Sequence, residues 1–249
     1  MVALVALAFL AGLAAGSFAT AVAHRVPRGI GVAASRSRCP HCGAQIAARD
    51  NIPLLGWLLL RGRARCCGAP ISPRYPLTEL TVGILFAVTV VVHRHDSVAE
   101  VAIDLVFVTT LAAITLTDLE QRIIPNKILL AAAIVCVAIA APTDPSGLPE
   151  RFIAAAAAGG VLFLVVFAYP KGMGLGDVKL AATMGLFLGR AVAPAIFAAL
   201  LIGSAVGLVL IARHGSTARK MAIPFGPFLA LGGVIGMLAG DQIMDAYLG

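Results

Sequence analysis

Long apolar runs alternate along the chain with short stretches that are charged or rich in proline and glycine. The runs lie at about 1–23, 76–92, 98–117, 127–141, 150–169, 178–189, 191–212 and 223–245. A membrane-spanning helix needs about 20 mostly apolar residues, and the runs lack the alternation that marks the strands of a membrane β-barrel. The pattern therefore predicts an all-α polytopic membrane protein with about eight transmembrane helices.

The composition supports this prediction and affects how the net positive charge of the chain is interpreted. Of the 249 residues, 60% are hydrophobic and 12% are charged, whereas soluble domains are about 45–50% apolar and about 25% charged. A soluble globular enzyme is therefore excluded. A net charge of +7 would favour nucleic acid in a soluble protein, but here the basic residues lie beside apolar runs. We expect membrane lipid, and no nucleic acid, to face them.

The basic residues also orient the chain. Residues 24–75 hold nine arginines and one acid, Asp50, and loops rich in Lys and Arg stay in the cytoplasm. With eight spans, sixteen of the nineteen basic residues fall on that side. We predict a multi-pass protein of the cytoplasmic (inner) membrane with both termini outside. Its parts are a first transmembrane helix (1–23), a cytoplasmic Cys-rich loop domain (24–75) and a transmembrane helical bundle (76–249).

Four of the five cysteines lie in this loop, as Cys39-Pro-His-Cys42 and the adjacent pair Cys66 and Cys67. A reducing cytoplasm argues against disulfides and for a metal site. Tetrahedral Zn²⁺ accepts four thiolates, and it would hold together a loop too small to form its own core.

The second cysteine pair departs from the usual Cys-x-x-Cys spacing, because Ala64 stands where its first member would be. Three possibilities follow: Cys66 supplies the fourth zinc ligand, His41 supplies it, or the site is degenerate. A basic linker with incidental thiols is the alternative to a metal site.

Two aspartates stand at the ends of apolar runs, where ionisable side chains are costly and therefore functional candidates. Asp118 ends the third run and Asp177 begins the sixth, so two spans separate them and both lie on one membrane face. Two carboxylates close together in a partly dehydrated site share a proton. One then acts as general base on a water and the other as acid toward a peptide carbonyl, which predicts acid–base hydrolysis.

Small and rigid residues accompany the two aspartates. Gly172, Gly174 and Gly176 precede Asp177, and without a Cβ they allow main chain to approach a peptide substrate closely. Pro125 begins the next helix and ends the loop that carries Asp118.

Together these motifs resemble those of the type IV prepilin peptidases over nearly the whole chain. They are residues 12–18, the Cys-x-x-Cys loop, residues 51–57 and 73–80, Asp118 with residues 124–126, and residues 174–180. The resemblance implies a GxGD-type aspartic protease of the cytoplasmic membrane with Asp118 and Asp177 as its catalytic pair. Gly174, Gly176, Pro125 and Lys179 would support the substrate or the backbone, and residues 76–249 would form the protease bundle.

The resemblance also implies a substrate class and a second activity. Members of this family cut the short basic leader from prepilins, pseudopilins or competence pilin-like proteins, and many then methylate the new amino terminus with S-adenosylmethionine. Glu79 falls in a motif assigned to the methyltransferase, an ion pair with Arg74 being the alternative. Thr20, where Asn is usual, and Ala64 depart from the family pattern.

Two other functions compete with the peptidase. A transporter would use the boundary acids to relay protons or bind a cation, and it predicts an internal repeat of broken helices, for which the sequence offers no convincing candidate. A nonenzymatic, zinc-anchored scaffold of pilus or secretion machinery would tolerate the loss of either aspartate.

Overall fold

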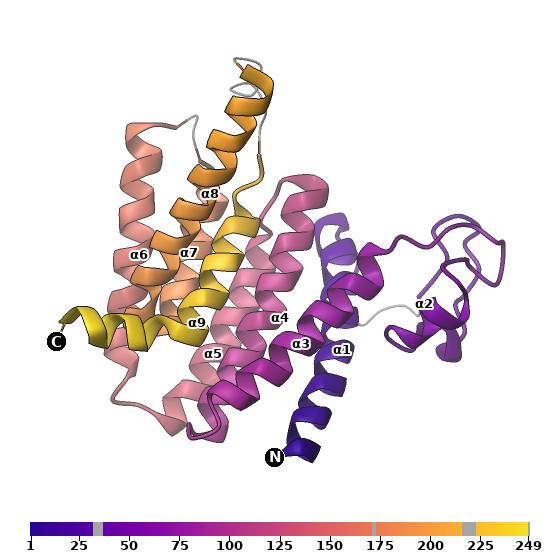
Figure 1. Cartoon of the computed structure of the whole chain (residues 1–249), viewed down its shortest axis with the longest axis horizontal. Helices are drawn as coiled ribbons and strands as arrows, with labels where there is room; N and C mark the ends of the chain where they lie inside the picture. Colours follow the sequence, from indigo (N-terminus) through magenta and orange to yellow (C-terminus); the bar gives the residue numbers. More distant parts are fainter. Residues whose placement is uncertain (32–36, 171–172, 216–222, 249) are drawn as a thin grey trace. The chain divides into compact units, whose positions relative to one another are not determined.

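The computed structural model describes residues 1–31, 37–170, 173–215 and 223–248, which are mainly helical apart from the irregular segment 37–73 (Figure 1). Their α-helices are α1 (Val2–Arg25), α2 (Leu55–Leu59), α3 (Arg74–Val92), α4 (Val98–Gln121), α5 (Asn126–Thr143), α6 (Leu148–Ala168), α7 (Leu175–Leu188), α8 (Val192–His214) and α9 (Gly226–Leu248). Short 3₁₀ turns are η1 (Val26–Arg28), η2 (Ala48–Asn51) and η3 (Gly189–Ala191). The predicted all-α class is confirmed. Gly172 lies outside the described ranges, as do four of the basic residues counted above, Arg36, Lys171, Arg219 and Lys220.

Within the described ranges, seven helical stretches are long and apolar enough to cross a membrane. One of them, Leu175–His214, is 40 residues long and contains both α7 and α8. Gly189 separates these two helices with a φ of +54°, which glycine adopts without steric cost. The chain is therefore a multi-pass helical membrane protein, and the predicted total of about eight is reached when α7 and α8 are counted separately.

The helices form two compact units, Met1–His95 and Asp96–Gly249. In the first unit α1 packs along α3. A Cβ on Gly12 would lie 2.7 Å from the Cα of Gly83, and one on Gly16 would lie 2.7 Å from the Cα of Glu79. These glycines therefore let the two backbones approach closely. The predicted division assigned all residues from 76 onward, and so most of α3, to the protease bundle. The contacts of the structure instead group α3 with α1 in the first unit.

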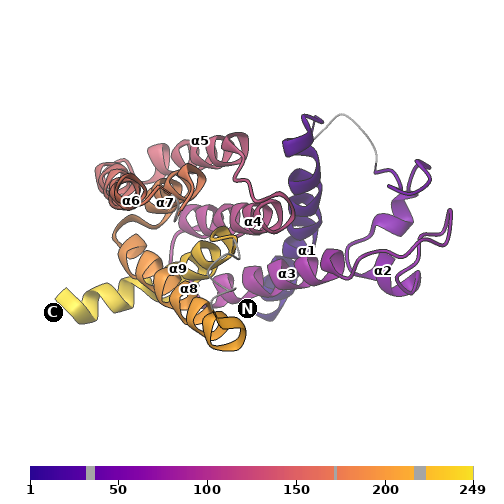
Figure 2. The ribbon, with the colours of Figure 1, turned by 90° about the horizontal axis from the view of Figure 1, so that it is seen from above.

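The second unit holds α4 to α9, with α6 packed on α7 and α8 packed on α9 (Figures 1 and 2). Phe107 of α4 stacks on Phe187 of α7 with ring centroids 5.0 Å apart, and both rings are buried. A Cβ on Gly185 would lie 2.5 Å from the carbonyl oxygen of Ala154, so α7 lies directly against the backbone of α6. This packing fixes α7, the short helix that carries Asp177.

Candidate active site and metal-binding cluster

Asp118 lies in the last turn of α4 and is 6% exposed. The helix ends where Arg122 adopts left-handed backbone angles and donates its N–H to the carbonyl oxygen of Asp118. On the side chain, Oδ2 accepts a hydrogen bond of 2.8 Å from the backbone N–H of Gly226, the first residue of α9. The carboxylate is therefore held between the end of α4 and the beginning of α9.

Asp177 occupies the first turn of α7 and is 8% exposed. Its Oδ2 accepts a hydrogen bond of 3.1 Å from the backbone N–H of Gly174, and its own N–H donates to the carbonyl oxygen of Gly174 at 3.1 Å. A negative side chain is favourable at this position because the helix amino terminus carries partial positive charge. The reciprocal hydrogen bonds orient the carboxylate at the helix start.

One cavity of about 250 Å³ joins the two aspartates. Its lining residues are Asp118, Arg122, Ile123, Ile124, Asn126, Gly174, Gly176, Asp177 and Lys179. The structure thus brings together both predicted catalytic residues and three of the four predicted support residues. The cavity contains carboxylates for acid–base chemistry and cationic groups, Arg122 and Lys179, beside them.

The linker from α4 to α5 is docked on the beginning of α7 through two contacts. A Cβ on Gly176 would lie 3.0 Å from the Cβ of Ile124, so glycine is needed for close packing against the protein itself. Lys179 Nζ donates a hydrogen bond of 3.1 Å to Oδ1 of Asn126, the first residue of α5. These contacts connect the segments that follow Asp118 and surround Asp177.

The other two predicted support residues have simpler surroundings. Pro125 caps α5 with a φ of −69°, as expected for a residue that begins a helix. A Cβ on Gly174 would meet Oδ2 of Asp177 at 3.5 Å, which is ordinary contact. Steric crowding from the protein therefore explains the glycine at 176 but not the glycine at 174.

Gly226 contacts Asp118 in the candidate site, and sequence reasoning missed it. It is buried, and a Cβ there would lie 2.7 Å from Oδ2 of Asp118. It stands 108 positions after Asp118, so no local motif joins the two residues. The signal in the sequence is a glycine between two prolines, Pro224 and Pro227, at the beginning of the last apolar run.

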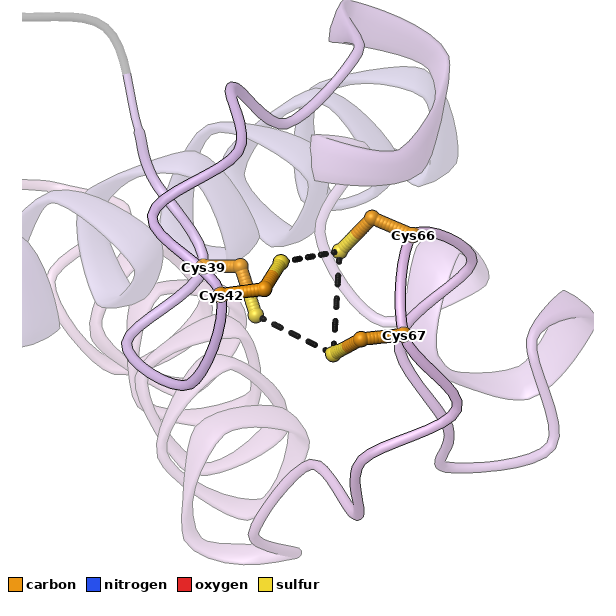
Figure 3. A group of neighbouring side chains, drawn as sticks. All are labelled: Cys39, Cys42, Cys66 and Cys67. Carbon is orange, nitrogen blue, oxygen red and sulfur yellow. Dashed lines mark hydrogen bonds between the residues drawn. The ribbon is translucent and has the colours of Figure 1, made fainter.

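The four loop cysteines lie on two similar turns that face one another in the first unit (Figure 3). In the first turn, the N–H of Cys39 donates to the carbonyl oxygen of Ala44 and Gly43 donates to that of Cys39. In the second, Ala64 and Gly68 make the equivalent bonds, Ala64 to Ala69 and Gly68 to Ala64. Ala64 therefore occupies the backbone position that Cys39 holds in the first turn.

Cys66 brings the fourth sulfur into this cluster. The four Sγ atoms all lie within 4.8 Å of one another, and His41 is not part of the group. The Sγ–Sγ distances are 3.7 Å for Cys39 and Cys67, 3.3 Å for Cys42 and Cys66, and 3.9 Å for Cys66 and Cys67. Around a tetrahedral zinc with Zn–S bonds of about 2.3 Å, sulfurs lie about 3.8 Å apart. The cluster therefore fits a metal of this kind.

The thiols of the cluster differ in their readiness to ionise. Backbone N–H groups of Cys42 and His41 lower the pKa of Cys39 to about 6, so this sulfur is a thiolate near neutral pH, the form that binds metal. Hydrogen bonding to Cys42 raises the pKa of Cys66 to about 12. A metal bound by all four sulfurs would displace the Cys66 proton, since metal ligands bind deprotonated.

We expect Cys66→Ser to remove tightly bound zinc from the purified chain, because three thiolates and an exposed hydroxyl bind Zn²⁺ far more weakly than four thiolates. His41→Ala, in the opposite turn, is the matched control and should keep about one zinc per chain. Metal content is measured by inductively coupled plasma mass spectrometry after dialysis against a weak chelator. Loss of zinc from the His41 variant with retention in the Cys66 variant would reverse the assignment.

Glu79 lies in α3 and is 7% exposed. Its Oε2 accepts a hydrogen bond of 2.7 Å from the backbone N–H of Leu54, which precedes α2. Leu54 has a φ of +62°, and Leu55 donates its N–H to the carbonyl oxygen of Pro53 at 2.6 Å. Glu79 therefore fixes a strained γ-turn of the Cys-rich loop to a membrane helix.

Comparison with known proteins identifies the family. The model of the bacterial peptidase A24 N-terminal domain matches residues 10–93, and that of the type IV leader peptidase family matches residues 105–212. Similar proteins include a prepilin leader peptidase/N-methyltransferase of Aeromonas hydrophila, 35% identical over 97% of this chain and 93% of the relative. Another, of Bacillus subtilis (strain 168), is 34% identical over 96% of each chain. The chain belongs to the type IV leader peptidase family.

Family membership confirms the resemblance predicted from the motifs. The gap between the two matched regions, 93 to 105, contains the boundary between the two structural units at His95. Asp118 and Asp177 lie within the second matched region, whereas Gly226 lies beyond it. No solved structure matches the chain.

Proposed function

We propose that this member of the family removes the leader from type IV prepilins and uses Asp118 and Asp177 as its catalytic pair. The observation that carries the proposal is the single cavity lined by both buried carboxylates. Relatives that match almost the whole chain are named prepilin leader peptidase/N-methyltransferase. This favours a peptidase over a proton-relaying transporter or a nonenzymatic scaffold.

In the proposed reaction one ionised aspartate takes a proton from a water as the water oxygen attacks the scissile carbonyl carbon. The other aspartate, protonated, donates its proton to the carbonyl oxygen. When the C–N bond of the gem-diol intermediate breaks, the leaving amine receives a proton from the first aspartate, and one hydroxyl of the intermediate returns its proton to the second, which restores both carboxyl groups. The backbone N–H groups of Gly226 and Gly174 hold one oxygen of each carboxylate in place, which orients the pair before the substrate arrives.

We place the cavity and the Cys-rich loop on the cytoplasmic side of the inner membrane, with both termini outside. The asymmetry of basic residues supports this orientation. A prepilin has an apolar amino-terminal helix in the membrane and a basic leader in the cytoplasm, so its cleavage point would lie at the same boundary as Asp118 and Asp177. Pseudopilins and competence pilin-like proteins share this architecture and are further candidate substrates.

The second proposed activity is methylation of the new amino terminus with S-adenosylmethionine as methyl donor. We assign it to the first unit, where Glu79 ties the loop to α3. Zn²⁺ would be held by Cys39, Cys42, Cys66 and Cys67, and it would act as a structural staple for a loop with little apolar core.

Co-expression of the chain with a prepilin tests both activities. We expect a product shortened at the leader junction, with one added methyl group at its new amino terminus, in intact-mass and peptide mass spectra. A prepilin that stays full length beside the wild-type chain would contradict the peptidase. A cleaved product that is never methylated would show that the chain has the peptidase activity but not the methyltransferase activity.

A further inference from the structure

The short helix α2 exposes large apolar side chains on the surface of the Cys-rich loop. Leu55, Leu58 and Leu59 are 54%, 52% and 75% exposed, and Ile52 just before them is 46% exposed. Leu55, Leu58 and Leu59 stand three and four positions apart in one helix and therefore share a face, and grouped apolar exposure of this kind marks an interaction surface, whereas single exposed leucines do not. This patch of Ile52, Leu55, Leu58 and Leu59 is called the α2 leucine patch below.

The opposite side of α2 is fixed to the loop, so the leucine patch cannot turn inward. Gly56 is buried against the backbone of Asp50. Trp57 donates a hydrogen bond of 3.0 Å from Nε1 to the carbonyl oxygen of Ile71, and its ring lies where a Cβ on Gly62 would meet it at 3.0 Å. The outward direction of the leucines is therefore built into the fold of the loop.

The attachment of α2 sets its depth relative to the membrane. Leu54, which immediately precedes α2, donates a hydrogen bond from its backbone N–H to Glu79. Glu79 is the sixth residue of the candidate span α3. At 1.5 Å per residue, Glu79 lies about 8 Å from the beginning of that span. The 19 residues of α3 correspond to about 28 Å, close to the thickness of the hydrocarbon core. The amino end of α2 is therefore held about 8 Å along α3 from one end of that span, near one boundary of the membrane.

The charge around the patch suits an anionic surface. Arg49, Arg61 and Arg63 are exposed on the same loop. Its single acid, Asp50, is bound by Arg65 through hydrogen bonds of 2.9 to 3.1 Å, which lower the pKa of the Asp50 carboxyl. Arg49 also lies close enough to Asp50 to lower the pKa of that carboxyl, whereas Arg61 and Arg63 make no ion pair with an acid among the described residues, so the loop keeps a positive charge on the segment that carries the exposed leucines.

We propose that α2 is an interfacial anchor. The α2 leucine patch inserts among the acyl chains of an anionic bilayer, and Arg49, Arg61 and Arg63 contact the lipid phosphates. This combination of an apolar face and adjacent basic residues is typical of elements that lie in the membrane interface. The anchor holds the Cys-rich loop against the membrane, and it does not depend on either enzymatic activity.

Photocross-linking tests the occupant of the patch directly. The full chain, with p-benzoylphenylalanine in place of Leu59, is reconstituted in vesicles of phosphatidylglycerol and phosphatidylethanolamine, irradiated and examined by mass spectrometry. The matched control carries the same probe in place of Gln45, an exposed residue of the first cysteine turn. We expect lipid adducts several-fold more abundant at position 59 than at 45. Cross-links from position 59 to the second unit or to another copy of the chain would overturn the proposal.

A second measurement uses the single tryptophan of the chain, Trp57, which lies in α2 itself. Brominated phosphatidylglycerol should quench its fluorescence in the wild type and in Gln45→Asp, and much less in the double variant Leu58→Asp, Leu59→Asp. An unchanged emission maximum in detergent shows that Trp57 keeps its packing in the variant. Equal quenching in all three proteins would contradict insertion of the patch, and if the double variant misfolds, the cross-link at position 59 decides.

Discussion

Asp118→Asn and Asp177→Asn are each expected to lower the rate of leader cleavage by about 10²- to 10⁴-fold, the range that positioned acid–base groups contribute. Asparagine keeps the shape of the side chain but neither takes a proton from water nor supplies one to the carbonyl oxygen. Both aspartates are buried and line one cavity, so each variant leaves a lone carboxylate. One carboxylate cannot act as base and acid in the same step.

The measurement is the initial rate of cleavage of a purified prepilin by the reconstituted chain. Glu120→Gln is the matched control, because Glu120 is an exposed acid two residues beyond Asp118 and should keep the wild-type rate. Residues that act as a unit are not additive, so the double variant should be no slower than the slower single variant. Wild-type cleavage by either aspartate variant would contradict the proposed mechanism.

The helices could be predicted from the sequence because the hydrocarbon core demands long apolar runs, and little else in a chain mimics them. The separation of α7 from α8 was also visible, since Gly189 and Arg190 interrupt an apolar stretch that extends over 40 residues. The order of the spans then brought Asp118 and Asp177 to the same face. Chain order alternates the side of successive helix ends, and no tertiary information is needed for this step.

Which helices pack together could not be predicted in the same way. Helix α3 is grouped with α1 because glycines of α1 lie directly against the backbone of α3. Gly12 lies against Gly83, and Gly16 lies against Glu79. Nearly every helix of this chain is apolar all round, so the apolar pattern does not distinguish a face that meets protein from one that meets lipid. The sequence contains the glycines, but it does not say which backbone each of them approaches.

The fourth cysteine of the candidate metal site shows a similar limit. Spacing identified Ala64 as the position where the first cysteine of the second pair is expected, and the structure places Ala64 there in the backbone of the turn. Cys66 nevertheless brings its sulfur to 3.3 Å from that of Cys42. The path of a side chain out of a tight turn depends on backbone angles, so spacing alone left three possibilities open: Cys66 as the fourth ligand, His41 as the fourth ligand, or a degenerate site.

Gly226 gives the second large effect expected of a single substitution. Gly226→Ala would place a Cβ 2.7 Å from Oδ2 and 3.1 Å from Cγ of Asp118, so the carboxylate has to move away from its hydrogen bond with the Gly226 N–H. A misplacement of about 1 Å in a catalytic group costs on the order of 10²-fold in rate. We therefore expect kcat to fall by about that factor with little change in KM, since the substrate contacts remain.

Gly207→Ala in α8 is the matched control, because no atom lies within 4 Å of a Cβ at that position. Gly207 lies in the interior of α8, where alanine is favoured over glycine by roughly 0.5–1 kcal/mol, and Gly226 is the first residue of α9, so neither substitution should break a helix. The rate of cleavage should fall only in the Gly226 variant. The Gly207 variant should unfold at or above the wild-type temperature, and so should the Gly226 variant except for the cost of its local clash with Asp118. A Gly226→Ala variant that cleaves at the wild-type rate would show that the close approach of α9 does not position Asp118, and the geometry of the pair would then depend on α4 and α7 alone.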